Sequence, residues 1–490
     1  MKTKITTLLG VLLIASAPQN NTFAMAEMSD ERSVGAVLVT DKTTVGYTLF
    51  STNNNTSTYL IDCDGALINE WESNYKVTKS VLLENGILLR ALRISGSASA
   101  MRNPISSGRL EMLNWDGTVI WSWDYLGEDY LLHHDFTPIK QADGSFTILA
   151  SSWELFTKEE AIEMGRDPRY CGGDSGNIWM EKLIEIKPMG SDSAEIIWQW
   201  RMADHLIQDL DKKRANYGVV ANNPQLMNVN YFKSTSSRTL DNSDWNHVSG
   251  IAYNPTLDQI AIANHGTNEV LIINHSTTTA QAAGSMGDII YRWGNPAAYN
   301  KGDHRDCRFS ALHAVCWIPK GCKDAGKIMV FNNGVINGAS SVDILDSAAG
   351  EICWSYSNGK DFFSREMGNG IRLENGNTII NEGSKGTIFE INTEGEIVWK
   401  YINPVIDTGA LPHDFDLDKM PTANSFGDWM NATYKIEWYS EDYAGLEGRD
   451  LTPDGYIENY KDQTPKLKSR TFNRGEIRLP RADSYKSSNN

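Results

Sequence analysis

The sequence predicts an all-β fold, a six-bladed β-propeller with short helical insertions, on three observations. One pattern recurs six times: an apolar strand, a turn rich in Asp, Gly or Asn, and a short strand that ends in Trp. A second hairpin precedes most copies, so that each unit supplies four strands. The chain also holds 15 Trp among its 490 residues, which favours a β-rich core. Six such units in a ring leave only short sheet edges exposed.

The repeats themselves show the alternation of half-buried strands, and their turn residues mark hairpins. The copies with a terminal Trp span residues 59–71, 110–121, 183–198, 270–293, 342–354 and 388–399. The preceding hairpins span residues 81–89, 136–149, 251–262, 315–330 and 371–380. The first copy lacks such a hairpin, and residues 433–439 are expected to supply a strand that closes the ring. Each terminal Trp is expected to pack between neighbouring blades.

Two insertions and two terminal segments complete the predicted organisation. Thr157 and Glu160 form a capping box that opens a short helix to about Met164, and residues 203–216 are interpreted as a second helix. We assign residues 1–26 to a signal peptide, 36–440 to the propeller, and 441–490 to a C-terminal extension with a polar tail.

Charge and composition restrict the partners. The net charge of −17 disfavours binding to nucleic acid and to anionic membrane surfaces. Lys2 and Lys4 precede an apolar stretch and small residues, as in an export signal, and no later run is apolar enough to span a bilayer. We therefore expect a periplasmic or secreted protein. That compartment would allow disulfides, and Cys316 and Cys322 flank a turn across which they could pair. The sequence does not determine the oligomeric state.

Histidines mark the predicted site. His134, His247 and His313 each stand just before a predicted inner strand, at matching places in three blades. Inner strands converge on the central channel, so these side chains are expected to share a pocket. His265 follows the inner hairpin of the His247 blade, and Arg365 occupies the matching place in the last blade. A set of structural histidines and a metal site are the alternatives to a shared pocket.

Several kinds of chemistry are not indicated. The sequence shows no dense carboxylate cluster beside these histidines, so no metal is predicted. It contains no Gly-rich phosphate loop, no dinucleotide-binding fingerprint and no Gly-x-Ser-x-Gly elbow, so no cofactor is predicted either. The reaction would then use only a small-molecule donor or water.

Three stretches of the chain resemble the aryl-sulfate sulfotransferase (arylsulfotransferase) family. They are Asp-Trp-Asn-His within residues 244–255, Leu-His-Ala-Val-Cys-Trp at 312–317, and Met-Val-Phe-Asn-Asn-Gly at 329–334. The similarity also covers residues 133–135, 372–378 and 442–446, and it extends over about residues 55–455. The chain resembles a divergent member, because the family's sulfated His lies on a later blade and here no His occurs between His313 and His413.

The resemblance implies a six-bladed propeller with a central active site. It implies nucleotide-independent transfer of a sulfuryl group from an aryl sulfate to a phenol through a sulfohistidine. It also places His247 and His313 in the active-site group. Small aryl sulfates and phenols are the expected substrates.

Chemical reasoning then distributes the roles. Transfer needs a neutral imidazole as nucleophile, cations for the sulfuryl oxygens, and an acid for the leaving phenolate. We expect His313 to carry the sulfate, because its apolar neighbours keep the ring neutral. His247 and His265 would then transfer protons, and His134 and Arg365 would bind the sulfate, with at least one further Lys or Arg nearby. The alternatives are an exported propeller lyase or hydrolase and a non-catalytic binding propeller.

Overall fold

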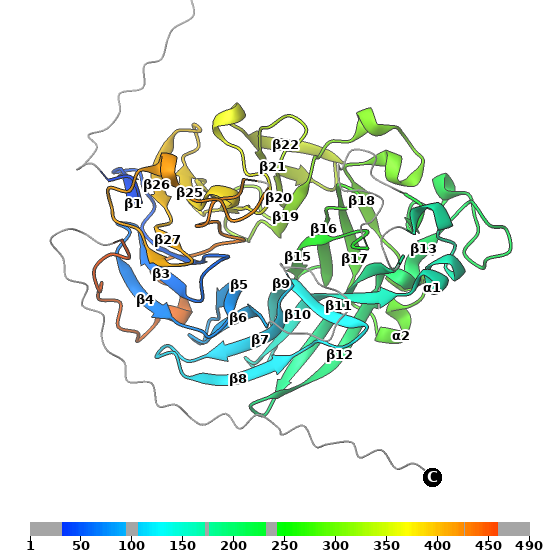
Figure 1. The fold of residues 1–490 in the computed structure, drawn as a ribbon, viewed down its shortest axis with the longest axis horizontal. Helices are drawn as coiled ribbons and strands as arrows, with labels where there is room; N and C mark the ends of the chain where they lie inside the picture. Colours follow the sequence, from blue (N-terminus) through cyan, green and yellow to red (C-terminus); the bar gives the residue numbers. More distant parts are fainter. Residues whose placement is uncertain (1–31, 95–105, 172–175, 232–242, 426, 459–490) are drawn as a thin grey trace, which may run out of the picture.

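Six antiparallel sheets surround a central channel in the computed structural model (Figure 1), which describes residues 32–94, 106–171, 176–231, 243–425 and 427–458. The predicted six-bladed β-propeller is thereby confirmed. The expected signal peptide, residues 1–26, lies outside the described residues, and so does the tail from residue 459 onward.

The first three blades each contain four strands, in order from the channel outward. Blade 1 contains β29 (Glu437–Tyr439), β2 (Tyr47–Ser51), β3 (Thr58–Asp62) and β4 (Leu67–Trp71). Blade 2 contains β5 (Lys76–Leu82), β6 (Leu88–Arg93), β7 (Gly108–Leu113) and β8 (Val119–Asp124). Blade 3 contains β9 (Tyr130–Lys140), β10 (Phe146–Phe156), β11 (Ile178–Met189) and β12 (Ser193–Arg201).

The other three blades follow the same order. Blade 4 contains β15 (Val248–Asn254), β16 (Gln259–Asn264), β17 (Glu269–Asn274) and β18 (Tyr291–Trp293). Blade 5 contains β19 (Leu312–Trp317), β20 (Ile328–Asn332), β21 (Ser341–Asp346) and β22 (Glu351–Tyr356). Blade 6 contains β23 (Asn369–Arg372), β24 (Thr378–Glu382), β25 (Thr387–Ile391), β26 (Ile397–Ile402) and, outermost, β1 (Gly35–Val39).

Two strand pairings between distant parts of the chain close the ring. The C-terminal strand β29 pairs with β2, with Tyr439 opposite Tyr47, so that it becomes the innermost strand of blade 1. The N-terminal strand β1 pairs with β26 on the outside of blade 6. The expectation that residues 433–439 close the ring is therefore confirmed. Because both ends of the propeller are held in sheets, neither leaves a long unpaired edge.

The tryptophans that end the repeats join neighbouring blades. Five indole N–H groups donate hydrogen bonds to the next blade around the ring: Trp71 to Asn114 O, Trp121 to Ser193 O, Trp198 to Thr277 Oγ1, Trp293 to Gly350 O, and Trp399 to Cys63 O. Buried apolar clusters fill the six junctions between sheets. The core of this protein is thus a ring of six inter-blade cores rather than one centre.

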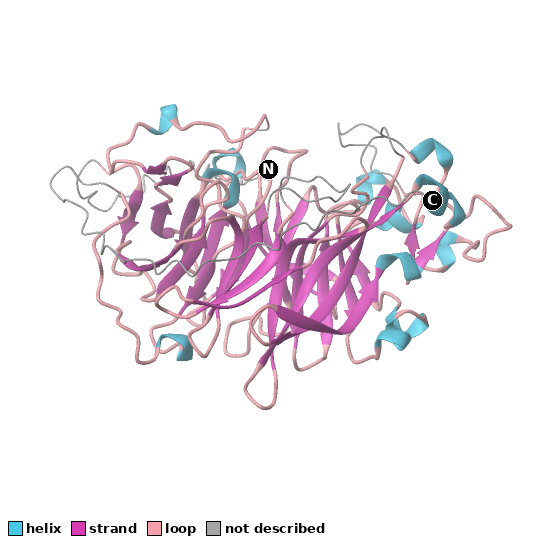
Figure 2. Ribbon diagram, turned by 60° about the horizontal axis from the view of Figure 1, so that its bottom comes forward, coloured by secondary structure: helices cyan, strands magenta, loops and turns pink. Residues whose placement is uncertain are grey.

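Short elements lie outside the blades, and the helices among them are found at the margins of the sheets (Figure 2). They include α1 (Lys158–Glu163), α2 (Thr279–Ala282), and the strand pairs β13 (Leu206–Ile207) with β14 (Met227–Asn228) and β27 (Val405–Ile406) with β28 (Gly409–Ala410). The predicted helix after Thr157 is confirmed as α1, which has its capping box in place.

The prediction of a helix over residues 203–216 is wrong. Only a 3₁₀ turn, Met202–His205, forms there, and β13 follows it. The Gln208 side chain accepts hydrogen bonds from the backbone N–H groups of Leu210 and Asp211, which holds the chain in a turn. Such local side-chain bonds compete with the helical ladder.

Two further expectations concern cysteines and the membrane. Cys316 and Cys322 form no disulfide with each other, and their sulfurs lie near the carbonyl oxygens of Gly370 and Arg372. Within the described part of the chain, no helix has the length and apolar character that a membrane crossing requires.

Candidate active site

Five histidines converge where the inner strands of blades 3, 4 and 5 begin. We call His133, His134, His247, His265 and His313 the histidine cluster. Ring centroids lie 5.5 Å apart for His134 and His247, 5.5 Å for His247 and His265, and 6.4 Å for His265 and His313. Tyr434, on the segment that leads into β29, completes the circle at 4.8 Å from His134 and 5.7 Å from His313. The structure therefore brings together the four histidines that the sequence singled out.

Their exact placement differs from the expectation. His134 and His313 lie inside β9 and β19, whereas His247 alone stands just before its strand. In the pairing of β9 with β10, Leu132 lies opposite Ser152 and Phe136 lies opposite Ala150, so the β9 residues between them form a bulge. In the pairing of β19 with β20, His313 has no residue opposite it. Such bulges turn side chains out of the normal alternation.

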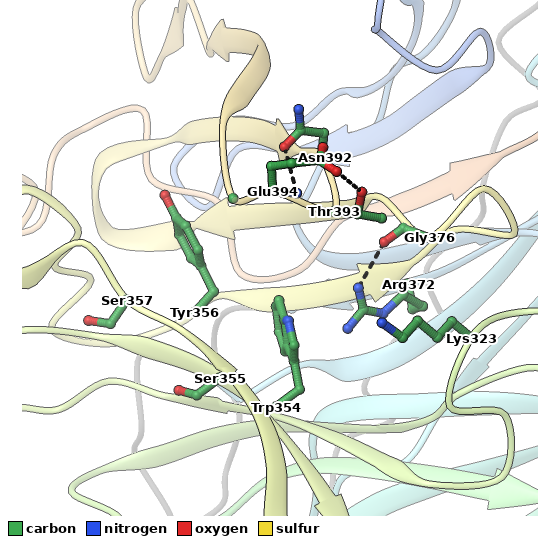
Figure 3. A pocket seen from close by; sticks show the side chains of 11 residues that line it. Lys323, Trp354, Ser355, Tyr356, Ser357, Arg372, Gly376, Asn392, Thr393 and Glu394 are labelled. Carbon is green, nitrogen blue, oxygen red and sulfur yellow. Dashed lines mark hydrogen bonds between the residues drawn. The ribbon is translucent and has the colours of Figure 1, made fainter. Parts of the chain in front are cut away.

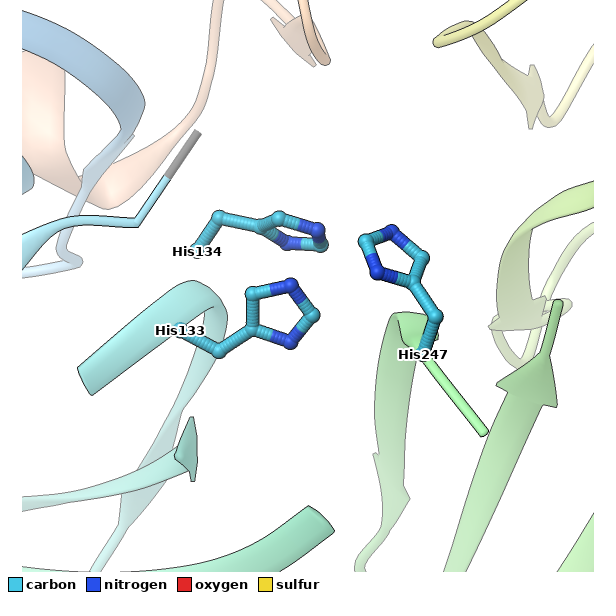
Figure 4. Close-up of side chains that lie close together, drawn as sticks. All are labelled: His133, His134 and His247. Carbon is cyan, nitrogen blue, oxygen red and sulfur yellow. The ribbon is translucent and has the colours of Figure 1, made fainter. Parts of the chain in front are cut away.

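The bulge in β9 explains why two consecutive residues reach the site. Successive side chains of a regular strand point to opposite faces. At the bulge, however, the rings of His133 and His134 both point toward His247 (Figure 4). Their centroids are only 3.7 Å apart, and Trp153 packs at 3.7 Å from His133 on the other side.

Unusual backbone conformations recur at the site. His247 has φ +38°, and Ala311 and Met367 have φ +61° and +62° at corresponding points of the next two blades. Non-glycine residues in this region cost about 1–3 kcal/mol each and concentrate at functional sites. Gly266 fits against the His247 loop because an added Cβ would lie 2.5 Å from the carbonyl oxygen of Trp245.

Hydrogen bonds determine which ring nitrogen carries the proton in three of the histidines. His247 Nδ1 lies 2.5 Å from Asp244 Oδ2, so it donates to the carboxylate and leaves a lone pair on Nε2. His313 shows the opposite arrangement, because its Nδ1 accepts from the Met367 N–H at 3.2 Å. The neutral His313 ring therefore carries its proton on Nε2. His265 Nδ1 donates to the Leu312 carbonyl at 3.2 Å.

Burial keeps three of the rings uncharged. His133, His134 and His313 are at most 6% exposed. Burial and His247 hold the pKa of His133 well below the usual imidazole range, and burial and His133 do the same for His134. For His313 the causes are burial and the charge of Lys435. These rings are neutral near pH 7.

Two carboxyl groups support the cluster from behind. Asp244 holds His247, and Glu181 Oε1 lies 2.7 Å from His133 Nδ1, although not in line for a hydrogen bond. Glu181 Oε1 also accepts from the N–H of Val248. Burial and the neighbouring Asp244 raise the pKa of Glu181 well above its usual range. The sequence contained no hint of Glu181, which lies on β11.

A buried group of charges lies beside the histidines. We call Lys79, Asp135 and Lys435 the charge cluster. Asp135 accepts from Lys79 at 2.8 Å, from Lys435 at 2.7 Å and from the N–H of Ile251 at 2.7 Å. Burial alone would raise the pKa of Asp135, but the two lysines outweigh it and lower that pKa. Lys435 is the further cation that was expected near the histidines.

Two arginines stand near the same end of the ring. Arg365 lies two residues before Met367, on the segment that reaches His313, and is half-buried. Arg93 ends β6 opposite Lys76, the first residue of β5, and therefore lies where the inner strands begin. Its Nε has no hydrogen-bond partner among the described residues, and burial lowers its pKa to about 10. The sequence analysis missed Arg93.

A separate cavity lies between blades 5 and 6. It has a volume of about 270 Å³ and is lined by Trp354, Tyr356, Arg372 and the turn at residues 392–395 (Figure 3). Arg372 stacks over Trp354 at 4.4 Å. Because Arg372 ends β23, the cavity lies toward the opposite end of the ring from the histidine cluster.

Comparison with known proteins adds the family. Solved structures with a similar fold include a protein of unknown function from Bacteroides caccae (11% identity, 81% of this chain and 100% of that chain, TM-score 0.42). A protein from Lactobacillus plantarum is 10% identical, with 81% of this chain and 100% of that chain covered and a TM-score of 0.38. Virginiamycin B lyase from Staphylococcus aureus is 10% identical, with 76% of this chain and 84% of that chain covered and a TM-score of 0.35. No curated protein matches the chain in sequence. The arylsulfotransferase (ASST) family model matches residues 25–410, and so this chain belongs to the arylsulfotransferase family of sulfotransferase enzymes.

Proposed function

We propose that this protein transfers a sulfuryl group from an aryl sulfate to a phenol through a sulfated histidine, and that His247 is this histidine. Family membership supports the reaction class. The observation that carries the residue assignment is the contact of His247 Nδ1 with Asp244, which leaves the Nε2 lone pair available as a nucleophile.

The reaction then has two balanced steps. In the first step, His247 Nε2 attacks the sulfur, the bond from sulfur to the phenol oxygen breaks, and the phenolate leaves while His313 Nε2–H donates a hydrogen bond to its oxygen; the released phenolate takes its proton from solvent. In the second step, the acceptor phenol gives its proton to solvent, its oxygen accepts the same hydrogen bond from His313 and attacks the sulfur, and the bond from sulfur to nitrogen breaks. The proton on His313 Nε2 follows from the hydrogen bond that Met367 donates to Nδ1.

This assignment exchanges two roles that the sequence suggested. His313 was expected to be the nucleophile, but its Nε2 lone pair would be free only if Nδ1 were protonated against the Met367 N–H. His265 is retained as a proton-transfer residue, since it lies between His247 and His313. His134 and Arg365 are retained as sulfate-binding residues.

The positive side chains support binding of the sulfuryl oxygens. The transferred group carries negative charge, and the protein as a whole is strongly acidic, so local cations must hold it. Lys435 lies close enough to His313 to depress its pKa. Arg93 supplies a half-buried second cation at the same end of the ring.

Mass spectrometry tests the proposal. Incubation of the wild-type protein with p-nitrophenyl sulfate alone should release p-nitrophenol in a single burst and add one sulfuryl group to the peptide that contains His247. Addition of phenol should restore turnover. The label should disappear in His247→Ala and persist, with slow formation, in His313→Ala. A label on the His313 peptide would return the carrier role to His313, and the absence of any burst with several aryl sulfates would contradict the reaction itself.

Export is the second part of the proposal. The basic and apolar N-terminus supports secretion or transport to the periplasm. Fractionation of expressing cells, with N-terminal sequencing of the exported form, should find cleavage near residue 26. A full-length cytoplasmic product would contradict export.

A further inference from the structure

The side chains of His133, His134 and His247, here called the three-histidine group, have the arrangement of metal ligands. Each offers one ring nitrogen, and these nitrogens lie within 4.8 Å of one another (Figure 4). A first-row metal ion binds histidine nitrogen at about 2.0–2.1 Å, so three tetrahedral ligands lie roughly 3.3 Å apart. Small rotations of the rings would close the group around one ion.

Two of the three rings have a carboxyl group beside Nδ1, although only His247 is hydrogen-bonded to its carboxyl group. A metal-binding histidine usually directs its other nitrogen at a carboxyl group, which sets its orientation and strengthens it as a ligand. Here Nδ1 of His247 faces Asp244 at 2.5 Å, and Nδ1 of His133 faces Glu181 at 2.7 Å. The sequence predicted no metal because no carboxylate cluster lay beside the histidines along the chain. The fold brings these carboxyl groups to them from β11 and from the loop before β15.

The group also contains unsatisfied polar atoms. His133 is fully buried and His134 is 3% exposed, yet His133 Nε2 and His134 Nδ1 have no hydrogen-bond partner among the described residues. A buried polar atom without a partner is costly, and in native proteins it commonly indicates an ion, a water molecule or a functional role. The bulge in β9 directs both rings toward His247 rather than into the core.

We propose that His133, His134 and His247 bind one divalent transition-metal cation of the first row, with a fourth position open to solvent or substrate. Three imidazoles favour Zn²⁺, Co²⁺, Ni²⁺ or Cu²⁺ over Mg²⁺ and Ca²⁺, which prefer oxygen ligands. The bound cation occupies Nε2 of His247. If His247 carries the sulfuryl group, as proposed above, cation and sulfuryl group exclude each other, and that consequence alone rests on the proposed function.

Cobalt provides a direct readout that does not depend on activity. The purified full-length protein, first stripped with a chelator, is titrated with Co²⁺ and followed by its visible absorption. We expect one Co²⁺ per chain, with bands of a tetrahedral or five-coordinate site, and displacement by Zn²⁺. His133→Gln and His134→Gln should each weaken binding at least 10-fold, and so should Asp244→Asn, which removes no ligand. The control His304→Gln alters an exposed histidine and should bind as the wild type does.

The outcomes separate the two proposals. Circular dichroism establishes that each variant is folded, and Asp244→Asn keeps the test valid if a ligand variant does not fold. Absence of Co²⁺ bands when a concentrated protein solution is titrated with the metal beyond one equivalent, or binding unchanged in a folded His134→Gln, would overturn the metal site. Stoichiometric Co²⁺ binding by a protein that shows no aryl-sulfate turnover in its metal-free form would leave the metal site standing and contradict the proposed function. Turnover inhibited by one equivalent of Zn²⁺ and restored by chelator is expected if both are right.

Discussion

Two neighbouring regions of the channel differ in how completely their polar atoms are satisfied. In the charge cluster both oxygens of Asp135 accept hydrogen bonds, from Lys79, Lys435 and the N–H of Ile251. In the three-histidine group, His134, the residue just before Asp135, keeps Nδ1 without a partner among the described residues. The first region is closed on itself and holds four blades together. The second keeps buried ring nitrogens without a partner among the described residues, a feature that is common at binding sites.

The largest loss of stability should follow from removal of Asp135 from the charge cluster. In Asp135→Ala two buried lysines lose their counter-ion, and we expect a loss of about 3–5 kcal/mol in the free energy of unfolding. Denaturant unfolding measures it. The matched control is Asp64→Ala, in an exposed turn, which should leave the unfolding midpoint unchanged. A loss below about 1 kcal/mol in Asp135→Ala would mean that the cluster does not hold the blades together.

A substitution beside the three-histidine group should reduce turnover rather than stability. In Asp244→Asn the His247 ring is no longer held in the tautomer with a free Nε2, so aryl-sulfate turnover should fall by about 10²–10⁴-fold. The melting temperature should change little. Asp288→Asn provides the control, because Asp288 pairs with His205 at 2.9 Å outside the site. Equal activity losses in both variants would contradict a special role of the Asp244–His247 pair in turnover.

The hydrogen-bonded network around His275 should make the stability of the protein depend on pH. His275 links Glu185 of blade 3 to Asp258 of blade 4. Burial alone would lower the pKa of His275, but its hydrogen bonds to these carboxylates outweigh burial and raise it. The stabilisation is therefore complete below about pH 6.5, the unfolded value, and is lost as the pH rises through the folded pKa.

Comparison of wild type with His275→Gln measures this effect. At pH 6 the variant should be less stable by about 1–2 kcal/mol, and the difference should shrink as the pH increases above 6.5. Unfolding curves at several pH values give the profile. A difference that grows with pH would contradict the sign of the pKa shift.

The smallest effect is expected at the blade junctions. Trp121→Phe keeps an aromatic six-membered ring but removes the pyrrole part of the indole with the N–H that donates to Ser193 O, at a cost of about 1–2 kcal/mol. Trp354→Phe should cost less, because Trp354 stacks against Arg372 beside the cavity of Figure 3. Thermal unfolding of the two variants compares them directly. A larger loss in Trp354→Phe would show that the junction between blades 5 and 6 is held as tightly as the others.

Patterns along the chain were sufficient to predict the repeat, its closure and the meeting of the histidines. Strand periodicity, turn residues and terminal tryptophans are local signals, because each depends on residues that are neighbours along the chain. The strand 433–439 was predictable since one blade lacked its inner strand. The positions of His134, His247 and His313 relative to those strands were enough to predict that they would meet.

The surroundings of these histidines depend on contacts between segments that are distant in sequence. Lys435 and Asp135 lie 300 residues apart in sequence and meet because their strands converge on the channel. The bulges that turn His134 and His313 inward depend on pairing with β10 and β20, which no local pattern shows. The backbone N–H of Met367 determines the tautomer of His313 from the next blade. The hydrogen bonds and charges around a side chain at the centre of the ring come from neighbouring blades. The sequence of a single repeat therefore does not predict them.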